Sequence, residues 1–153
     1  MRELIQKWYD WLKQACPEPA EVATSTEKEE LSHVYSDGRQ LWATDGYRLH
    51  ARQVATGKPG HVVLDENGLF QVNGNGRLPN FAVCLPQSQP TATLVIERDK
   101  LLGALAGQDR HVRLTFFVED GVIELSSAGA YALVMAVVGL EEEDFWRPDT
   151  SEP

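Results

Sequence analysis

The sequence has no long hydrophobic run and contains only two cysteines. Its longest apolar segment, residues 130–138, is too short to cross a bilayer as a helix, so we expect no membrane partner. Residues 1–16 alternate polar and apolar side chains, whereas an export signal has an unbroken apolar core. Cys16 and Cys84 lie far apart without metal-ligand spacing. We therefore expect reduced thiols in a cytoplasmic protein.

Basic side chains are also scarce, because 14 lysines and arginines face 23 acidic residues and leave a formal net charge of -9. A protein that coats DNA non-specifically is usually basic, so this charge disfavours simple phosphate binding. It does not exclude a ring that gathers a few basic residues on one inner face. Much of the acidic charge lies in residues 27–30 and 141–152, and the remainder of the chain is closer to neutral.

Motifs for catalysis or cofactor binding are missing as well. Residues 56–60, Thr-Gly-Lys-Pro-Gly, lack the spaced glycine of a phosphate loop and have proline where the metal-binding hydroxyl belongs, so a surface turn is favoured. No serine stands in a Gly-x-Ser-x-Gly elbow. The histidines show no metal spacing; they are His33, His50, His61 and His111. We expect no catalytic residue, no metal and no cofactor.

Three aspartates, Asp37, Asp45 and Asp120, each precede a glycine. Together they could form a carboxylate cluster for magnesium. The favoured interpretation is that each shapes a turn, because an aspartate side chain readily bonds the local backbone.

Residues 2–16 predict an amphipathic helix, at about 100° per residue. Its apolar stripe comprises Leu4, Ile5, Trp8, Trp11, Leu12 and Ala15. Pro17 and Pro19 end it. Strands are predicted at residues 31–36 and 39–43, joined by a type I′ turn at Asp37-Gly38, and at residues 47–55.

The same order returns later in the chain. A strand at residues 91–96 precedes a helix at 97–106, which has Leu101, Leu102 and Leu105 on one face and ends at Gly107. Three further strands are predicted at 111–118, 122–127 and 130–138. We therefore predict an α+β domain, residues 1–140, of two αβββ halves with both helices side by side on one face of antiparallel sheets. Residues 141–153 form an acidic tail.

An additional piece separates the halves. Residues 61–72 predict a hairpin about Asn67-Gly68, and a glycine-rich loop at 73–76 leads into residues 77–86.

Two segments carry a family resemblance. The first reads Ala43-Thr44-Asp45-Gly46-Tyr47-Arg48-Leu49 and resembles the Ala-Thr-Asp-Gly-His-Arg-Leu signature of bacterial DNA sliding clamps. The second reads Arg77-Leu78-Pro79-Asn80-Phe81-Ala82-Val83-Cys84-Leu85-Pro86 and resembles the clamp pattern Arg-Phe-Pro-Asp-Tyr-x-x-Val-Leu-Pro. A clamp subunit has three such domains and this chain has room for one. The second pattern also precedes the second half here, whereas in the clamp it follows that half.

The resemblance implies a shallow apolar pocket for short linear peptides of polymerases and other replication or repair proteins. Its residues are Thr44, Gly46, Tyr47, Arg48, Leu49 and Pro79. Gly46 would let a peptide approach the backbone, Leu49 and Tyr47 would offer apolar area, and Arg48 would bond peptide carbonyls or a carboxylate. Tyr47 replaces the family's histidine. The alternative is that these residues only shape a hairpin and pack a core.

Clamps surround double-stranded DNA with the polar faces of their helices. The residues that would face DNA here are Arg2, Lys7, Lys13 and Lys100. Because so few cations are available, a lone domain should bind duplex weakly, and self-association would decide whether DNA binding matters.

The predicted function is a sliding-clamp-like protein that tethers a DNA polymerase or another partner to DNA as a possible homo-oligomer. The alternative is a peptide-binding adaptor without a ring, or an inhibitor of a host clamp.

In the tail, Phe145 and Trp146 follow four acidic residues. This composition favours either packing of both rings on a surface or a disordered end.

Overall fold

The computed structural model describes residues 1–23, 30–74 and 78–149. It is a mixed α+β structure with antiparallel sheets, as predicted. The chain divides into two compact units. Unit 1 comprises Met1–Gln87 together with Trp146–Pro153, and unit 2 comprises Ser88–Phe145. That residues 1–140 form a single domain stays a prediction.

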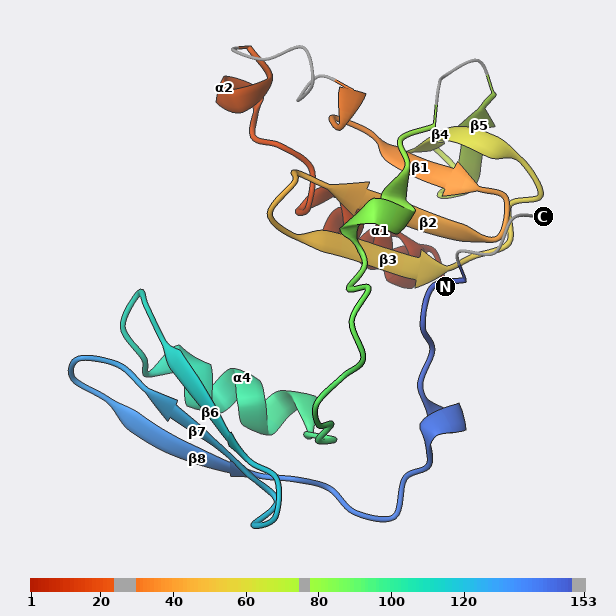
Figure 1. The fold of residues 1–153 in the computed structure, drawn as a ribbon. Helices are drawn as coiled ribbons and strands as arrows, with labels where there is room; N and C mark the ends of the chain where they lie inside the picture. Colours follow the sequence, from red (N-terminus) through yellow and green to blue (C-terminus); the bar gives the residue numbers. More distant parts are fainter. Residues whose placement is uncertain (24–29, 75–77, 150–153) are drawn as a thin grey trace. The chain divides into compact units, whose positions relative to one another are not determined.

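Unit 1 contains a sheet with a helix against it (Figure 1). In its described residues the helices include α1 (Arg2–Lys13), α2 (Pro19–Val22) and the short 3₁₀ helix η1 (Phe81–Cys84). Its strands are β1 (Val34–Asp37), β2 (Gln40–Thr44), β3 (Leu49–Gln53), β4 (Pro59–Leu64) and β5 (Phe70–Asn73). The strand order is β3-β2-β1-β4-β5, so the predicted hairpin of the additional piece extends the first sheet beside β1.

Helix α1 packs on β2 and β3 with a stripe different from the predicted one. Leu12 is fully buried, and Tyr9, absent from the predicted stripe, packs against the core. Leu4 and Trp11, which were assigned to the stripe, stay exposed. Trp11 instead stacks on His50 of β3, with ring centroids 4.2 Å apart. The helix also ends at Lys13 rather than at residue 16.

The two faces of the five-stranded sheet differ in chemistry, because successive strand residues point to opposite sides. The face toward α1 carries buried aliphatic side chains: Val34, Leu41, Ala43 and Val62. The other face, which we call the aromatic face, carries Tyr35, Trp42 and His61. Leu49 and Leu78, from two parts of the candidate site below, pack against the rings of this second face.

The turn between β1 and β2 differs from the predicted type. A type I′ turn at Asp37-Gly38 requires positive φ at both residues. Gly38 has φ +98°, but Asp37 does not have a positive φ. Ser36 pairs with Leu41, so Gly38 and Arg39 form the loop and Asp37 belongs to β1.

Close backbone approach explains one glycine in β4. Gly60 has φ +146°, and a Cβ built on it would lie 2.3 Å from the carbonyl oxygen of Asn73 in β5. Any side chain at this position would therefore force the β4–β5 pair apart.

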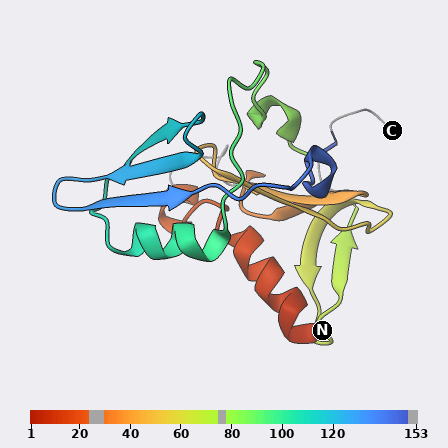
Figure 2. The same cartoon turned by 90° about the horizontal axis from the view of Figure 1, so that it is seen from below.

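Unit 2 contains α4 (Arg98–Ala106), the strands β6 (Arg113–Phe117), β7 (Val122–Ser126) and β8 (Tyr131–Met135), and the 3₁₀ helix η2 (Glu142–Asp144). The sheet order is β6-β7-β8, with α4 against β8 (Figure 2). The predicted strand at 91–96 is wrong, because this segment makes only one isolated bridge, Ile96 to Ala136. The predicted face of α4 is also wrong in part: Leu101 and Ala104 pack on the core, whereas Leu102 and Leu105 are exposed.

Each unit places a helix ahead of three consecutive antiparallel strands, which matches the predicted repeat in chain order. The clamp-like arrangement of these elements stays a proposal. In the described ranges, no helix combines the length and apolar character needed to span a membrane.

Candidate peptide-binding site

Residues 44–49 form a tight loop between β2 and β3. Thr44 is buried, and its Oγ1 donates to the carbonyl of Arg48 at 2.6 Å and accepts from the Gly46 N–H at 3.0 Å. Gly46 has φ +92°, a conformation that favours glycine. The predicted strand from residue 47 begins only at Leu49, because the loop occupies the preceding residues.

Asp45 closes this loop. Its carboxylate accepts from the N–H groups of Tyr47 and Arg48 at 2.9 and 3.0 Å, and from Arg48 Nε at 3.2 Å. Burial alone would raise the pKa of Asp45, but these donors and the Arg48 charge outweigh it and hold the pKa below its ordinary value. The turn interpretation of Asp45 is confirmed. Part of the Arg48 guanidinium therefore binds Asp45 instead of facing outward.

The loop presents apolar area at the rim of the aromatic face. Tyr47 is 89% exposed. Leu49 packs on a cluster of buried aromatic rings formed by Tyr35, Trp42 and Phe81, which we call the aromatic cluster. Leu78 packs on the same cluster. Half-buried Pro79 follows Leu78, and its carbonyl accepts the Phe81 N–H at 3.1 Å. Arg77 lies outside the described residues.

The aromatic cluster continues across the sheet as stacked and edge-on rings. Phe81 lies parallel to Trp42 with centroids 5.3 Å apart, and its ring is 5.8 Å from that of Tyr35. Tyr35 in turn meets His61 edge-on at 5.0 Å, and His61 stacks on His33 at 4.3 Å. The rings therefore form a continuous row of contacts from β2 to β4, in which Tyr35, Trp42 and Phe81 are buried.

Sequence reasoning omitted Trp42 and Phe81 from the site. A signal for each was present: Trp42 is two residues before Thr44 on the same strand and so shares its face, and Phe81 lies within the second clamp-like segment. The stacking of these two rings joins β2 to the second segment and could not be predicted from either alone.

The residues predicted to face DNA carry few positive charges, and acidic residues lie among them. Arg2, Lys7 and Lys13 are exposed on α1, and a hollow of about 710 Å³ beside the helix is lined by Arg2 and Lys7 but also by Glu3 and Asp10. Arg2 additionally donates to the carbonyl of Glu66. The positive and negative side chains balance, so this surface attracts phosphate only weakly.

The fourth cation, Lys100, belongs to α4 of unit 2. Its Nζ lies 3.2 Å from Glu97, and the neighbouring Arg98 pairs with Asp99 at 3.0 Å. Both pairs are exposed, and each offsets a positive charge on this helix.

The expected turn roles hold at two further places. Asp37 accepts from the Arg39 and Gln40 N–H groups at 2.9 and 3.0 Å, which confirms its turn interpretation. In the loop at residues 56–60, the Thr56 and Gly57 N–H groups bond the Gly38 carbonyl, so they are not directed at a phosphate. Within the described parts of the chain, no group of three or more histidine, cysteine or acidic side chains could hold a metal.

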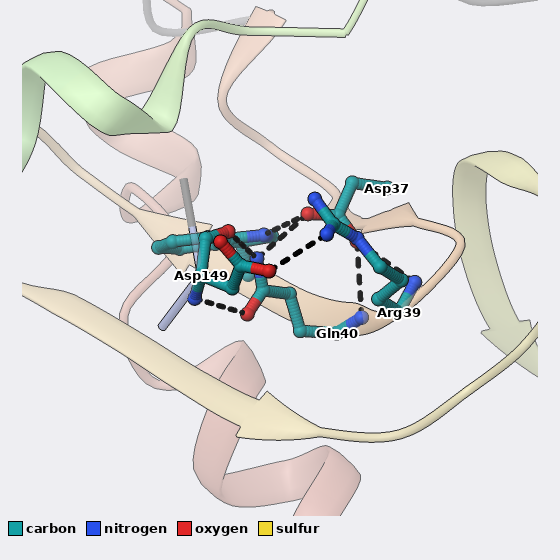
Figure 3. A network of polar contacts seen from close by, with 5 residues as sticks. Asp37, Arg39, Gln40 and Asp149 are labelled. Atoms are coloured by element: carbon teal, nitrogen blue, oxygen red, sulfur yellow. Dashed lines mark hydrogen bonds and ion pairs between the residues drawn. The ribbon is translucent and has the colours of Figure 1, made fainter. Parts of the chain in front are cut away.

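The tail contacts unit 1 through Asp149, at the end of β2 away from Thr44 (Figure 3). The side-chain amide of Gln40 accepts the Asp149 N–H at 3.1 Å and donates to its carbonyl at 2.6 Å. Arg39 forms an ion pair with the Asp149 carboxylate at 2.8 Å. Phe145 and Trp146, for which the sequence left packing and a disordered end as alternatives, are 51% and 41% exposed. No local pattern in the sequence pointed to Gln40.

Comparison with known proteins gives no relative: no family model, curated protein or solved structure matches this chain.

Proposed function

We propose that the protein is a sliding-clamp-like tether that holds a DNA polymerase or another replication or repair partner on DNA through a peptide-binding site on unit 1. One observation carries the proposal. The two segments that resemble clamp motifs meet at one aromatic cluster, Leu49 from the first and Leu78 from the second. A peptide with an apolar ending would lie along this rim, between the exposed ring of Tyr47 and Pro79.

The geometry favours a weak, reversible site. Trp42 and Phe81 are buried against each other, so a peptide would meet their rim and not an empty cavity. A shallow contact of this kind gives affinities in the micromolar range or weaker, roughly -8 kcal/mol or less in magnitude. Transient peptide docking suits a tether that exchanges partners.

Leu49→Ala is expected to weaken binding of a peptide with an apolar ending by about fivefold or more, because the side chain would lose contact with both the peptide and the aromatic cluster. Arg48→Ala should weaken it too, at little cost to folding, since its ion pair with Asp45 is partly exposed. Isothermal titration calorimetry measures the affinity, and circular dichroism melting checks the fold.

Leu69→Ala is the matched control, because Leu69 is an exposed leucine of the β4–β5 turn in the same unit. It should leave binding unchanged. Equal affinity in the wild type, Leu49→Ala and Arg48→Ala would place the peptide site elsewhere.

Self-association belongs to the same proposal. On unit 2, the sheet exposes large apolar side chains of β8, with Leu133 at 56% and Met135 at 62%. Monomeric proteins rarely expose such neighbouring groups without a partner. We propose that copies of the chain assemble there, so that Arg2, Lys7, Lys13 and Lys100 of several copies together face duplex DNA.

A second candidate function is a peptide-binding adaptor without a ring, or an inhibitor of a host clamp. The charge observations favour it: the net charge is -9, and Lys100 and Arg98 are each paired with an acid. Both functions use the same peptide site and differ in assembly. In either case we propose a cytoplasmic protein that catalyses no reaction.

A further inference from the structure

The Gln40 side chain binds the backbone of the C-terminal tail through two hydrogen bonds. Gln40 is 2% exposed, yet its amide bonds both the N–H and the carbonyl of a single residue, Asp149. This is the pair of bonds that one strand residue exchanges with its partner in an antiparallel sheet. The Gln40 side chain thus bonds Asp149 as the backbone of a neighbouring strand would.

Asp37 orients the Gln40 amide. Gln40 Nε2 donates to Asp37 Oδ2 at 2.7 Å, and Trp42 Nε1 donates to the same oxygen at 3.3 Å. An ionised carboxylate only accepts, so the amide nitrogen must face Asp37 and the amide oxygen must face outward as an acceptor. The Gln40 amide is therefore held in one orientation by Asp37, independently of the tail.

Arg39 adds charge recognition. Its guanidinium meets the Asp149 carboxylate at 2.8 Å, with both side chains about half exposed. An exposed pair of this kind contributes little to affinity. Recognition therefore depends mainly on the backbone of the bound residue, and the acidic side chain adds a preference.

We propose that Asp37, Arg39, Gln40 and Trp42 form a second peptide-binding site for an extended segment, with a preference for an acidic residue, which the chain's own C-terminal segment occupies and from which it can be displaced. The site does not rest on the proposed function, because it lies at the Gln40 end of β2 and the clamp-like loop begins at Thr44. While bound, the tail keeps competing acidic segments off the sheet.

The test uses the full chain labelled with ¹⁵N, with the Gln40 side-chain amide and the Trp42 indole N–H as reporters. Asp149→Pro removes the N–H that Gln40 accepts and leaves the sheet unchanged. Asp149→Asn is the matched control, because it keeps that N–H. Asp149→Pro should shift both reporters, and Asp149→Asn should leave them close to wild type.

The probe is a synthetic peptide with the sequence of residues 145–153. It should bind Asp149→Pro saturably and move the Gln40 signals. It should bind the wild-type chain at least about tenfold more weakly, since the tethered tail competes at high effective concentration. In the peptide, asparagine in place of the aspartate should lose about fivefold at most, and proline there should abolish binding.

Three results would overturn the proposal: reporters unchanged by Asp149→Pro, no shift of Gln40 signals when the peptide is added to that variant, or equal affinity for wild type and Asp149→Pro. Because the substitutions fall in the tail or in the peptide, loss of folding of the sheet cannot imitate any of them.

Discussion

Asp37 holds four donors with one carboxylate. They are the N–H groups of Arg39 and Gln40, the Gln40 side-chain amide and the Trp42 indole. Burial alone would raise the pKa of Asp37, but these hydrogen bonds outweigh it and keep the pKa below its ordinary value of 3.8. The same residue therefore closes the β1–β2 turn and orients the Gln40 amide that binds the tail.

Asp37→Asn should lower the free energy of unfolding at pH 7 by about 1–3 kcal/mol, because an amide cannot replace the charged acceptor. A depressed folded pKa stabilises above the unfolded pKa and loses this effect as pH falls through the folded pKa. The difference between wild type and variant should thus be full above about pH 5 and shrink below pH 4. Urea unfolding at a series of pH values measures it.

Asp10→Asn serves as the control, since Asp10 is exposed on α1 and an amide can still accept the bond from Gln6. It should change stability little. If wild type and Asp37→Asn lost stability in parallel between pH 7 and pH 3, the carboxylate would not have the role assigned to it.

At the scale of elements, α1 is held to the sheet by the face around Leu12, not by the whole predicted stripe. Leu12 is fully buried among the aliphatic side chains of β1, β2 and β4. Leu12→Ala should lower the free energy of unfolding by about 2–5 kcal/mol through lost burial and a remaining cavity. Leu4→Ala, at an exposed position about two helical turns nearer the start of α1, should change it by less than about 1 kcal/mol. Equal effects, measured by denaturant unfolding, would contradict the packing of this helix.

Local pattern predicted most elements but not their partners. Glycine-containing turn pairs between apolar segments located the hairpins of unit 1, because the preference for a turn is local. The strand predicted at residues 91–96 was wrong: Leu94 and Ile96 are packed on the unit 2 core, but the backbone beside them has almost no strand partner. Burial pattern and strand pairing are separate properties, and only the first is local.

The candidate site shows the same division. Thr44, Gly46 and Asp45 could be assigned to a turn from the sequence because their roles depend on neighbouring backbone. The pairing of β1 with β4 and the stacking of Phe81 on Trp42 join residues far apart in the chain. No local pattern contains that information, and the Gln40–Asp149 contact spans an even longer separation.

At the scale of the whole molecule, two units each present a distinct surface. Unit 1 has an aromatic face with a loop at its rim, and unit 2 has exposed apolar side chains on β8. The proposed tether needs both surfaces. Peptide docking would bind the partner protein, and self-association would bring the cations of several copies to DNA. An adaptor needs only the first surface.

Sedimentation equilibrium of the full chain over a range of concentrations tests the central proposal of a clamp-like ring most directly. We expect one closed oligomer, with a mass that is a fixed multiple of 17.1 kDa and does not grow further with concentration. Leu133→Lys, which places a charge on the exposed face of β8, should reduce that mass. A wild-type mass of 17.1 kDa at every concentration would contradict the ring and leave the adaptor as the function of this chain.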